Sequence, residues 1–357
     1  MNLFLGSYPI TPATDILHEL VKHKDFVTVF QAEDEIAAIG SAIGASFGGS
    51  LAVTTTSGPG FSLKAEFMNL AVITELPLII VDVQRAGPST GIPTKTEQSD
   101  LGQALYGRHG ESPVVVMAPG SPKDCFNIML EAAKVATKYM TPVIVLSEGY
   151  LGNGSEVWKV PTLSELPEIP VKFVTNPEGY QPYKRNPDTL ARPWAIPGTP
   201  KLEHRLGGLE KEDGPGNVSS AGPNHEKMSN LRAEKITRVA QEIPPTETYG
   251  AKDAELLVLG WGGTEGTIKN AVRNLTRKGH KVACANLRYL NPLPPDLKPL
   301  LKKYKKVLIP ELNMGQLWFR IRGEYLIDTE KFSKMQGQPF MSEEIENKIL
   351  QMLGAAK

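Results

Sequence analysis

Short apolar runs alternate with longer amphipathic segments over the first 150 residues of the chain. The runs are rich in Val, Ile and Leu and are apolar on both faces, at 27–30, 50–56, 78–83, 114–117 and 143–146. Such runs are typical of parallel strands buried between two layers of helices. The intervening patterns predict helices over 14–23, 35–46, 61–73 and 122–137. This alternation predicts an α/β fold with a parallel sheet.

A second alternating unit begins near residue 254. Its pattern predicts strands over 255–263, 281–287 and 306–311 and one helix over 264–278. Gly279 follows the predicted helix directly, which is a common way for a helix to end. The pattern therefore predicts another, smaller α/β domain.

The stretch from 151 to 230 lacks this periodicity and is rich in Pro and Gly. Trp, Tyr and His residues are interleaved with charges there, which distinguishes it from a low-complexity spacer. We therefore expect an ordered segment packed on the domains or on a partner rather than a plain linker. We therefore expect a first domain over 1–160, a Pro/Gly-rich ordered connection with one helix over 161–250, and a second domain over 251–357.

Composition narrows the class of protein. The 357 residues hold 39 Lys and Arg against 39 Asp and Glu, so no overall basic field favours a nucleic-acid partner. No apolar run reaches the ~18 residues that a membrane span needs, and the first residues lack the features of a secretory signal. Cys125 and Cys284 are the only cysteines and are far apart, so the chain cannot supply four thiolates for an iron–sulfur cluster. A reduced, cytoplasmic protein is expected.

Two common sites are disfavoured by spacing. The glycines at 260, 262 and 266 are one residue too widely spaced for a dinucleotide fingerprint, and no acid stands about 20 residues further on, at the end of the next strand. We interpret them as a tight turn from strand to helix, which weakens the alternative of a nucleotide-binding module. The six histidines show no metal-ligand spacing, so no metal site is expected on this chain.

Candidate chemistry gathers in the first domain. Glu35 opens a small, apolar helix and begins the face that continues with Ile39, Ala42 and Ile43. A carboxyl on such a buried face has a raised pKa unless a partner donates a hydrogen bond to it. Glu33 and Asp34 precede it, and compensation of the helix dipole accounts for part of this acidic cluster.

Three loops follow predicted strands. Ser57, Gly58, Pro59 and Gly60 follow one strand and open a helix, and they resemble a backbone wall beside a ligand. Arg85 stands at the carboxyl end of another strand, where ligands bind in open α/β sheets, and the loop after it carries Lys95. Thr11 lies in a proline-rich turn before a helix whose N-terminus suits a carboxylate.

Together these segments resemble the α subunits of 2-oxoacid:ferredoxin oxidoreductases, most closely the 2-oxoglutarate (2-oxoglutarate synthase) type. The matching motifs are Tyr-Pro-Ile-Thr-Pro at 8–12, Glu-Asp-Glu-Ile-Ala-Ala-Ile-Gly at 33–40, Thr-Ser-Gly-Pro-Gly-Phe at 56–61, the loop 87–98, His-Glu-Lys-Met at 225–228 with Arg232 and Lys235, and Glu-Leu-Asn-Met-Gly-Gln-Leu at 311–317. The resemblance implies a pyrimidine-binding domain like those of thiamine diphosphate enzymes, followed by a transketolase C-terminal-like domain.

The resemblance also implies roles for single residues. A glutamate of the pyrimidine-binding domain hydrogen-bonds the aminopyrimidine N1′, and Glu35 is favoured over Glu33 because Gly44 follows it by nine residues, the spacing usual in thiamine enzymes. The segment 57–60 would line the cofactor. Thr11 and Arg85 would hold the substrate carboxylate, and Lys95 would meet the distal carboxylate of a dicarboxylic oxoacid.

The implied reaction is the oxidative decarboxylation of 2-oxoglutarate with coenzyme A to succinyl-CoA, carbon dioxide and reduced ferredoxin. Pyruvate or branched-chain oxoacids as substrates, and a non-catalytic scaffolding subunit, remain alternatives. The chain has no Gly-Asp-Gly…Asn segment preceded by a strand. The resemblance therefore places Mg²⁺ and the [4Fe–4S] clusters on a β subunit, with ferredoxin as a further partner. It also implies that the γ-like domain often fused ahead of this region is missing.

Overall fold

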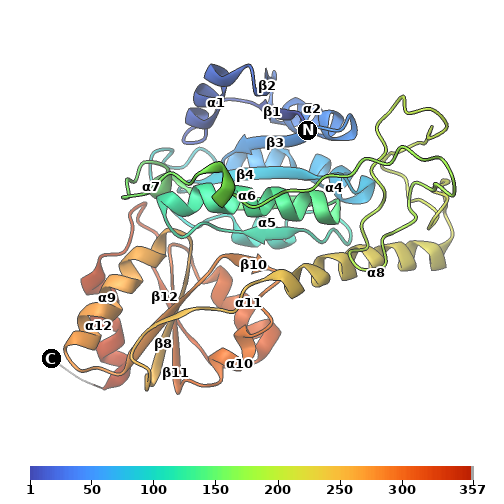
Figure 1. Ribbon diagram of the computed structural model, residues 1–357. Helices are drawn as coiled ribbons and strands as arrows, with labels where there is room; N and C mark the ends of the chain where they lie inside the picture. Colours follow the sequence, from blue (N-terminus) through green and yellow to red (C-terminus); the bar gives the residue numbers. More distant parts are fainter. Residues whose placement is uncertain (355–357) are drawn as a thin grey trace.

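The computed structural model describes residues 1–354 and contains two β-sheets, each with helices packed on it (Figure 1). The first sheet has seven strands, in the spatial order β10 (Tyr289–Asn291), β5 (Val115–Met117), β6 (Pro142–Glu148), β4 (Leu78–Gln84), β3 (Leu51–Thr56), β1 (Leu3–Ser7) and β2 (Val27–Gln31). All neighbouring strands run parallel except β10, which is antiparallel to β5. The parallel strands are short and apolar, as the sequence predicts.

Helices cover both faces of this sheet. They are α1 (Thr14–Leu20), α2 (Glu35–Phe47), α3 (Gly58–Leu63), α4 (Ala65–Thr74), α5 (Leu101–Tyr106), α6 (Pro122–Tyr139) and the short α7 (Gly149–Gly152). Apolar residues of α2, α3, α4 and α5 share one buried cluster, whereas those of α6 belong to the cluster on the other face. The central strands β4 and β6 are buried along their whole length because both sides are covered, whereas the edge strand β2 is largely exposed.

The second sheet has five strands, in the order β12 (Glu330–Ser333), β11 (Lys306–Glu311), β8 (Leu256–Trp261), β9 (Val282–Leu287) and the antiparallel β7 (Thr248–Gly250). Its helices are α9 (Glu265–Arg277), α10 (Leu297–Leu301), α11 (Gln316–Tyr325) and α12 (Ser342–Leu353). In Figure 1, α9 and α12 lie on the outer side of the sheet, and α10 and α11 lie on the other. Two mixed α/β units with parallel sheets confirm the predicted fold class.

The two units share a core. The buried cluster that contains Phe61 of α3 and Met68 of α4 also contains Trp261 of β8 and Leu317 of α11. β10 strengthens the junction, because it follows β9 of the second sheet in sequence but pairs with β5 of the first. Burial of apolar surface between the sheets therefore fixes their relative position.

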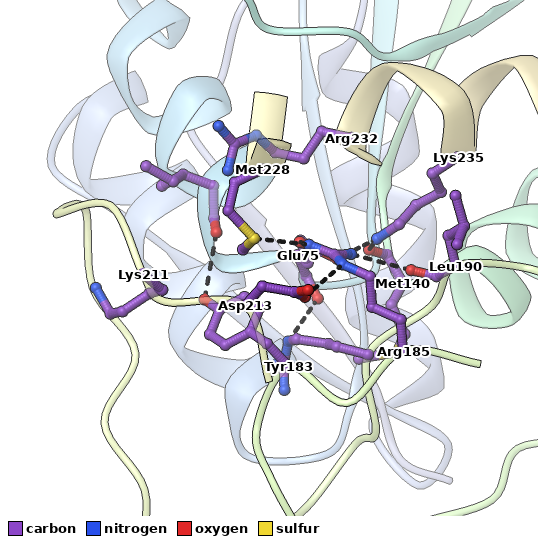
Figure 2. A network of polar contacts seen from close by, with 12 residues as sticks. Glu75, Met140, Tyr183, Arg185, Leu190, Lys211, Asp213, Met228, Arg232 and Lys235 are labelled. Atoms are coloured by element: carbon purple, nitrogen blue, oxygen red, sulfur yellow. Dashed lines mark hydrogen bonds and ion pairs between the residues drawn. The ribbon is translucent and has the colours of Figure 1, made fainter. Parts of the chain in front are cut away.

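Residues 153–221 contain only a short 3₁₀ turn at Leu163–Glu165 and isolated bridges, and they lead into the long helix α8 (Gly222–Val239). Tyr183 and Trp194 of this segment are almost fully buried. Glu75, the residue after α4, anchors the segment and α8 through ion pairs with Arg185 and Lys235 (Figure 2). Burial raises the pKa of Glu75, but the charges of Lys235 and Arg185 outweigh burial and lower it to about 2.

One predicted helix is interrupted in the structure. The helix predicted over 61–73 is two helices, α3 and α4, which meet at Lys64. Lys64 is completely buried, and its Nζ atom donates a 2.8 Å hydrogen bond to the carbonyl oxygen of Glu35 on α2. The interruption therefore places a buried cation beside the start of α2.

Candidate active site at the carboxyl edge of the first sheet

The predicted functional loops leave the same edge of the first sheet. β1, β3 and β4 are adjacent and parallel, with Leu5 opposite Val53 and Thr56 opposite Asp82. Their carboxyl ends therefore lie together, followed by the loops that carry Thr11, the segment 57–60 and Arg85. A buried 2.7 Å hydrogen bond between the hydroxyls of Ser7 and Thr55 joins β1 and β3 close to this edge.

Glu35 is the first residue of α2. The preceding Asp34 caps the helix, because its carboxylate accepts a 2.7 Å hydrogen bond from the Ala37 amide. The Glu35 side chain is buried, with 8% of its surface exposed, and its carboxylate accepts no hydrogen bond from any residue in the range 1–354. Neither carboxylate oxygen is closed off from solvent, so the carboxylate is available to a donor on a bound molecule.

Gly60, in the first turn of α3, lies directly against the Glu35 side chain. A Cβ atom there would overlap Thr56 Oγ1 and would lie 2.6 Å from Glu35 Cγ and 2.8 Å from Glu35 Oε1. Only glycine therefore fits between the end of β3 and the Glu35 side chain. Ser57 Oγ and Thr54 Oγ1 are buried nearby in sequence and have no partner among the described residues. The structure thus brings Glu35 and the segment 57–60 together.

Lys64 is a site residue that sequence reasoning missed. Burial lowers the pKa of its ammonium to about 8, against the opposing effect of the charges of Glu35 and Asp34. Its bond to the Glu35 carbonyl fixes the backbone at the first turn of α2. A lysine inside an otherwise apolar helical pattern was the available signal, since lysine is rarely buried without a partner.

Arg85 and Thr11 are also brought together. Arg85 is 7% exposed, and its Nη1 atom donates a 2.7 Å hydrogen bond to the carbonyl oxygen of Thr11. The Nε atom of Arg85 is buried without a partner among the described residues. Ser99 Oγ donates to the Arg85 carbonyl at 2.9 Å and holds the loop in place. The guanidinium is therefore oriented by the Thr11 backbone and keeps donor capacity for a ligand.

Lys95 lies further out on the loop that follows β4. Its backbone is held by hydrogen bonds of 2.9 Å to the Ala86 amide and 3.0 Å to the Ile92 carbonyl. Its side chain is exposed, and its ammonium forms no hydrogen bond or ion pair within residues 1–354. The structure does not bring Lys95 into contact with Thr11 or Arg85, but it leaves the Lys95 charge free.

Two buried carboxyl groups lie next to the segments that carry Gly58 and Arg85. Asp82 on β4 is fully buried and Asp100 at the start of α5 is 8% exposed, and both have an oxygen without a partner in the described chain. Burial and the neighbouring Asp100 charge raise the pKa of Asp82 well above its usual range. Both Asp100 carboxylate oxygens would lie 3.1 Å from a Cβ on Gly58. Burial and the repulsion between two close carboxylates both favour the protonated form of this pair. Sequence reasoning missed the pair.

The loop 85–100 is clamped to the second domain. The Gln98 side chain donates to the Trp261 carbonyl at 2.8 Å and accepts from the Leu312 amide at 2.9 Å. Gln316 adds a 2.9 Å bond from its amide nitrogen to the Ser99 carbonyl. The 87–98 and 311–317 motifs are thus two sides of one contact, and this contact holds the loop after Arg85 rigidly.

Glu148, at the end of β6, makes a second clamp. It is 1% exposed, and its carboxylate accepts hydrogen bonds of 2.5 Å from Thr96 Oγ1 and from the Gly263 amide. A Cβ on Gly263 would overlap Glu148 Oε1, so the glycine turn after β8 serves this contact. The interpretation of the 260–266 glycines as a tight turn is thereby confirmed. Burial raises the pKa of Glu148 to about 7, despite the two donors.

This raised pKa predicts a pH-dependent stability. A carboxyl whose pKa is higher in the folded chain stabilises it most below its ordinary value of 4.5, and the contribution is lost as the pH rises through about 7. From pH 5 to pH 8 the free energy of unfolding of the wild-type protein should therefore fall by on the order of 3 kcal/mol more than that of the Glu148→Gln variant, which has no carboxyl to titrate at this position. Urea midpoints of both proteins at the two pH values test this. Parallel pH profiles would contradict it.

Other site classes find no support in the described chain. No group of three or more His, Cys, Asp or Glu residues within 1–354 is arranged to hold a metal ion. None of the helices described combines the length and hydrophobicity needed to cross a membrane. Neither of two well-formed pockets elsewhere in the fold is lined by Glu35 or Arg85.

Comparison with known families agrees with this architecture. Residues 2–221 match the family described as pyruvate flavodoxin/ferredoxin oxidoreductase, thiamine diphosphate-binding. Residues 254–345 match the pyruvate:ferredoxin oxidoreductase core domain II. The first match covers β1 to β6 and the irregular residues 153–221, and the second covers β8 to β12.

Individual relatives give the same picture. The 2-oxoglutarate oxidoreductase subunit KorA of Mycobacterium tuberculosis is 56% identical over 347 residues, which are 97% of this chain and 53% of that protein. The chain thus spans about half the length of this relative. The 2-oxoglutarate synthase subunit KorA of Methanocaldococcus jannaschii is 35% identical, with 97% of this chain and 94% of that protein covered.

Solved structures extend the likeness to three dimensions. The 2-oxoglutarate:ferredoxin oxidoreductase from Magnetococcus marinus, with 2-oxoglutarate, coenzyme A and succinyl-CoA bound, matches with a TM-score of 0.94 and 37% identity. The match covers 98% of this chain and 62% of the other. A split-gene transketolase matches at a TM-score of 0.53 with 11% identity, which shows a shared fold alone.

Proposed function

Because the chain belongs to the α subunits of the 2-oxoacid:ferredoxin oxidoreductase family, we propose that it contributes half of the active site of a thiamine diphosphate-dependent enzyme that oxidises 2-oxoglutarate. The reaction would consume coenzyme A and yield succinyl-CoA, carbon dioxide and reduced ferredoxin. The observation that carries the proposal is the carboxylate of the largely buried Glu35, which lies against Gly60 at the carboxyl edge of the first sheet and has no donor among the described residues.

The residues at this edge fit an aminopyrimidine. Glu35 offers a carboxyl group in a narrow space that a Cβ on Gly60 would fill. Ser57 and Gly58 add a backbone wall, and the Ser57 hydroxyl is left without a partner. Thiamine diphosphate, when bound, supplies the electron sink that the release of carbon dioxide from a 2-oxoacid requires.

Glu35 acts in this proposal through one proton. Its carboxyl would hold a proton at the pyrimidine N1′ position of a bound cofactor, which would favour the tautomer that can act as a base. Lys64 holds the backbone of Glu35 through its 2.8 Å bond, and Asp34 caps the same helical turn. Both contacts fix the backbone from which the Glu35 carboxyl extends, and a fixed first turn helps to place the carboxyl for proton transfer.

Arg85 and Thr11 provide the substrate contact in this proposal. The buried guanidinium has an unpartnered Nε atom and is oriented by the Thr11 carbonyl. A charge-assisted bond from Arg85 would hold the carboxylate next to the reacting carbonyl, with the exposed Thr11 hydroxyl as a second donor. Lys95 would pair with the distal carboxylate of 2-oxoglutarate, because its ammonium has no partner within residues 1–354.

Replacement of Lys95 tests this selection. Lys95→Ala should raise KM for 2-oxoglutarate by roughly tenfold and leave KM for 2-oxobutyrate within about twofold, because only the first substrate has a distal carboxylate. Lys303→Ala, an exposed lysine on the second domain, is the matched control. Equal effects on both substrates would remove Lys95 from substrate selection.

We further propose that a second subunit completes the site. The described residues offer no cluster of metal ligands for the Mg²⁺ that a diphosphate group binds or for iron. A β subunit would carry Mg²⁺ and the [4Fe–4S] centres and pass electrons to ferredoxin.

The assembled complex should reduce ferredoxin with 2-oxoglutarate and coenzyme A far faster than with pyruvate. Faster turnover of pyruvate or a branched-chain oxoacid would overturn the assignment of the substrate.

A further inference from the structure

A basic pocket lies far from the Glu35 site. It has a volume of about 630 Å³ and lies between the C-terminal part of α6 and the irregular residues 169–194. Arg192 on its wall bonds the Thr74 carbonyl just before β4, and Met140 precedes β6. The pocket is therefore at the amino ends of the strands, whereas the Glu35 site is at their carboxyl ends.

The charges that line this pocket are all of one sign. Six of its lining residues are cationic and none is Asp or Glu, the cations being Lys134, Lys138, Lys172, Lys184, Arg185 and Arg192. Such a concentration of like charge in a concave site raises the local concentration of anions.

Neighbouring carboxylates neutralise only part of this charge. Glu242 lies 3.6 Å from Lys134 and 2.8 Å from Lys138, and Arg185 is paired with Glu75. Glu75 is shared with the buried Lys235, so it does not cancel both cations. Lys172, Lys184 and Arg192 form no ion pair with the described residues. The pocket keeps a net positive charge.

Three buried donors of the lining residues have no hydrogen-bond partner among residues 1–354, and the first is Nε of Arg185, which lies 4.0 Å from Asp213 Oδ1. Arg192 is 2% exposed and donates from Nε to the Thr74 and Glu75 carbonyls at 2.9 and 3.0 Å, but its Nη2 atom has no partner among residues 1–354. Trp194 is 3% exposed, and its Nε1 atom is likewise without a partner there. A buried donor left unpaired costs about 1–3 kcal/mol, and all three donors belong to residues that line this pocket.

The base of the pocket is held by the Glu75 network. Figure 2 shows Arg185 beside Glu75, Met140 and Leu190, with Lys235 approaching Glu75 from α8. Arg185 donates to Glu75 Oε2 at 2.6 Å and to the Leu190 carbonyl at 3.0 Å. Its guanidinium is therefore fixed before any ligand arrives, which lowers the entropy cost of binding.

We propose that this pocket binds a small anion with a diphosphate group, held by Lys172, Lys184 and Arg192. A diphosphate carries several charges and many acceptor oxygens, which matches several cations and unused donors better than a single carboxylate does. Val171, Pro193 and Trp194 form an apolar wall that would take the organic part of such a ligand. The site is separate from the proposed thiamine diphosphate position and does not depend on it.

Pyrophosphate is the direct probe. The assembled enzyme, already saturated with thiamine diphosphate, Mg²⁺ and coenzyme A and then freed of excess ligand, is titrated with sodium pyrophosphate at constant ionic strength. The double variant Lys172→Ala/Lys184→Ala should bind roughly tenfold more weakly or worse, since two charge-assisted contacts are lost. Lys302→Ala/Lys303→Ala, a pair of exposed lysines in the second domain, should bind like the wild type. ADP and inorganic phosphate in parallel titrations distinguish an organic diphosphate from a simple ion.

Each outcome decides the proposal. Weaker binding by the Lys172/Lys184 variant alone, with unchanged turnover as proof of folding, supports the site. Absence of pyrophosphate binding, or equal binding by both double variants, overturns it. A structure of the complex in which an acidic segment of a partner chain fills the pocket overturns it as well.

Discussion

Glu35→Gln is expected to lower turnover of the assembled enzyme by roughly 10²–10⁴-fold, the range over which a positioned acid or base acts. The amide has nearly the same size, so the packing against Gly60 and the start of α2 should persist. What is lost is the proton that the carboxyl shares with the pyrimidine. The measurement is kcat for 2-oxoglutarate with ferredoxin as the acceptor, together with binding of thiamine diphosphate by titration.

Glu33→Gln is the matched control for this experiment. Glu33 stands two residues away, is exposed and precedes the helix, so its loss should change turnover by no more than about twofold. Near-normal turnover of Glu35→Gln would remove Glu35 from the reaction. A large loss in Glu33→Gln instead would transfer the role to Glu33.

Glu75→Gln should destabilise the protein by about 3–5 kcal/mol, the cost of leaving buried cations without their counter-charge. Glu75 is 1% exposed and contacts both Arg185 and Lys235, which are buried as well (Figure 2). Burial already lowers the pKa of Lys235 to about 8, and loss of the Glu75 charge removes the main opposing effect. The free energy of unfolding from urea titration measures the effect.

A nearby glutamate supplies the comparison. Glu66→Gln changes an exposed residue of α4, the helix that Glu75 follows, and within residues 1–354 its carboxylate has one possible ion-pair partner, His109 Nε2 at 3.5 Å. Its effect should stay within about 0.5 kcal/mol, as is usual at the surface. If both variants lost equally little stability, the buried network would not anchor residues 153–221 and α8.

The sheets were predictable because their strands are buried on both faces. Runs such as 78–83 and 143–146 can be recognised as apolar without knowing which strands pair with them, and each is a central strand of the first sheet. β10 and α5 were not predicted. β10 has three residues and exists through its pairing with β5, and α5 is a six-residue helix tied to Gln316. Such short elements are stabilised by tertiary contacts rather than by a local pattern.

The candidate site divides in the same way. Glu35, Arg85 and the segment 57–60 follow strands or open helices, so topology alone brings them to one edge. Lys64, Asp82 and Glu148 were missed because their roles arise from contacts between distant parts of the chain. The Glu148 carboxylate, for example, bonds Thr96 and Gly263, which are 52 and 115 residues away. No spacing rule in the sequence relates such residues.

The most direct test is a structure of the assembled complex with thiamine diphosphate bound. The account predicts a Glu35 carboxylate oxygen within about 3 Å of the pyrimidine N1′ atom, which is hydrogen-bond distance. It also predicts that the diphosphate and its Mg²⁺ are held by residues of another subunit. A Glu35 carboxyl remote from the pyrimidine ring, or Mg²⁺ ligated by side chains of this chain, would contradict the central claim.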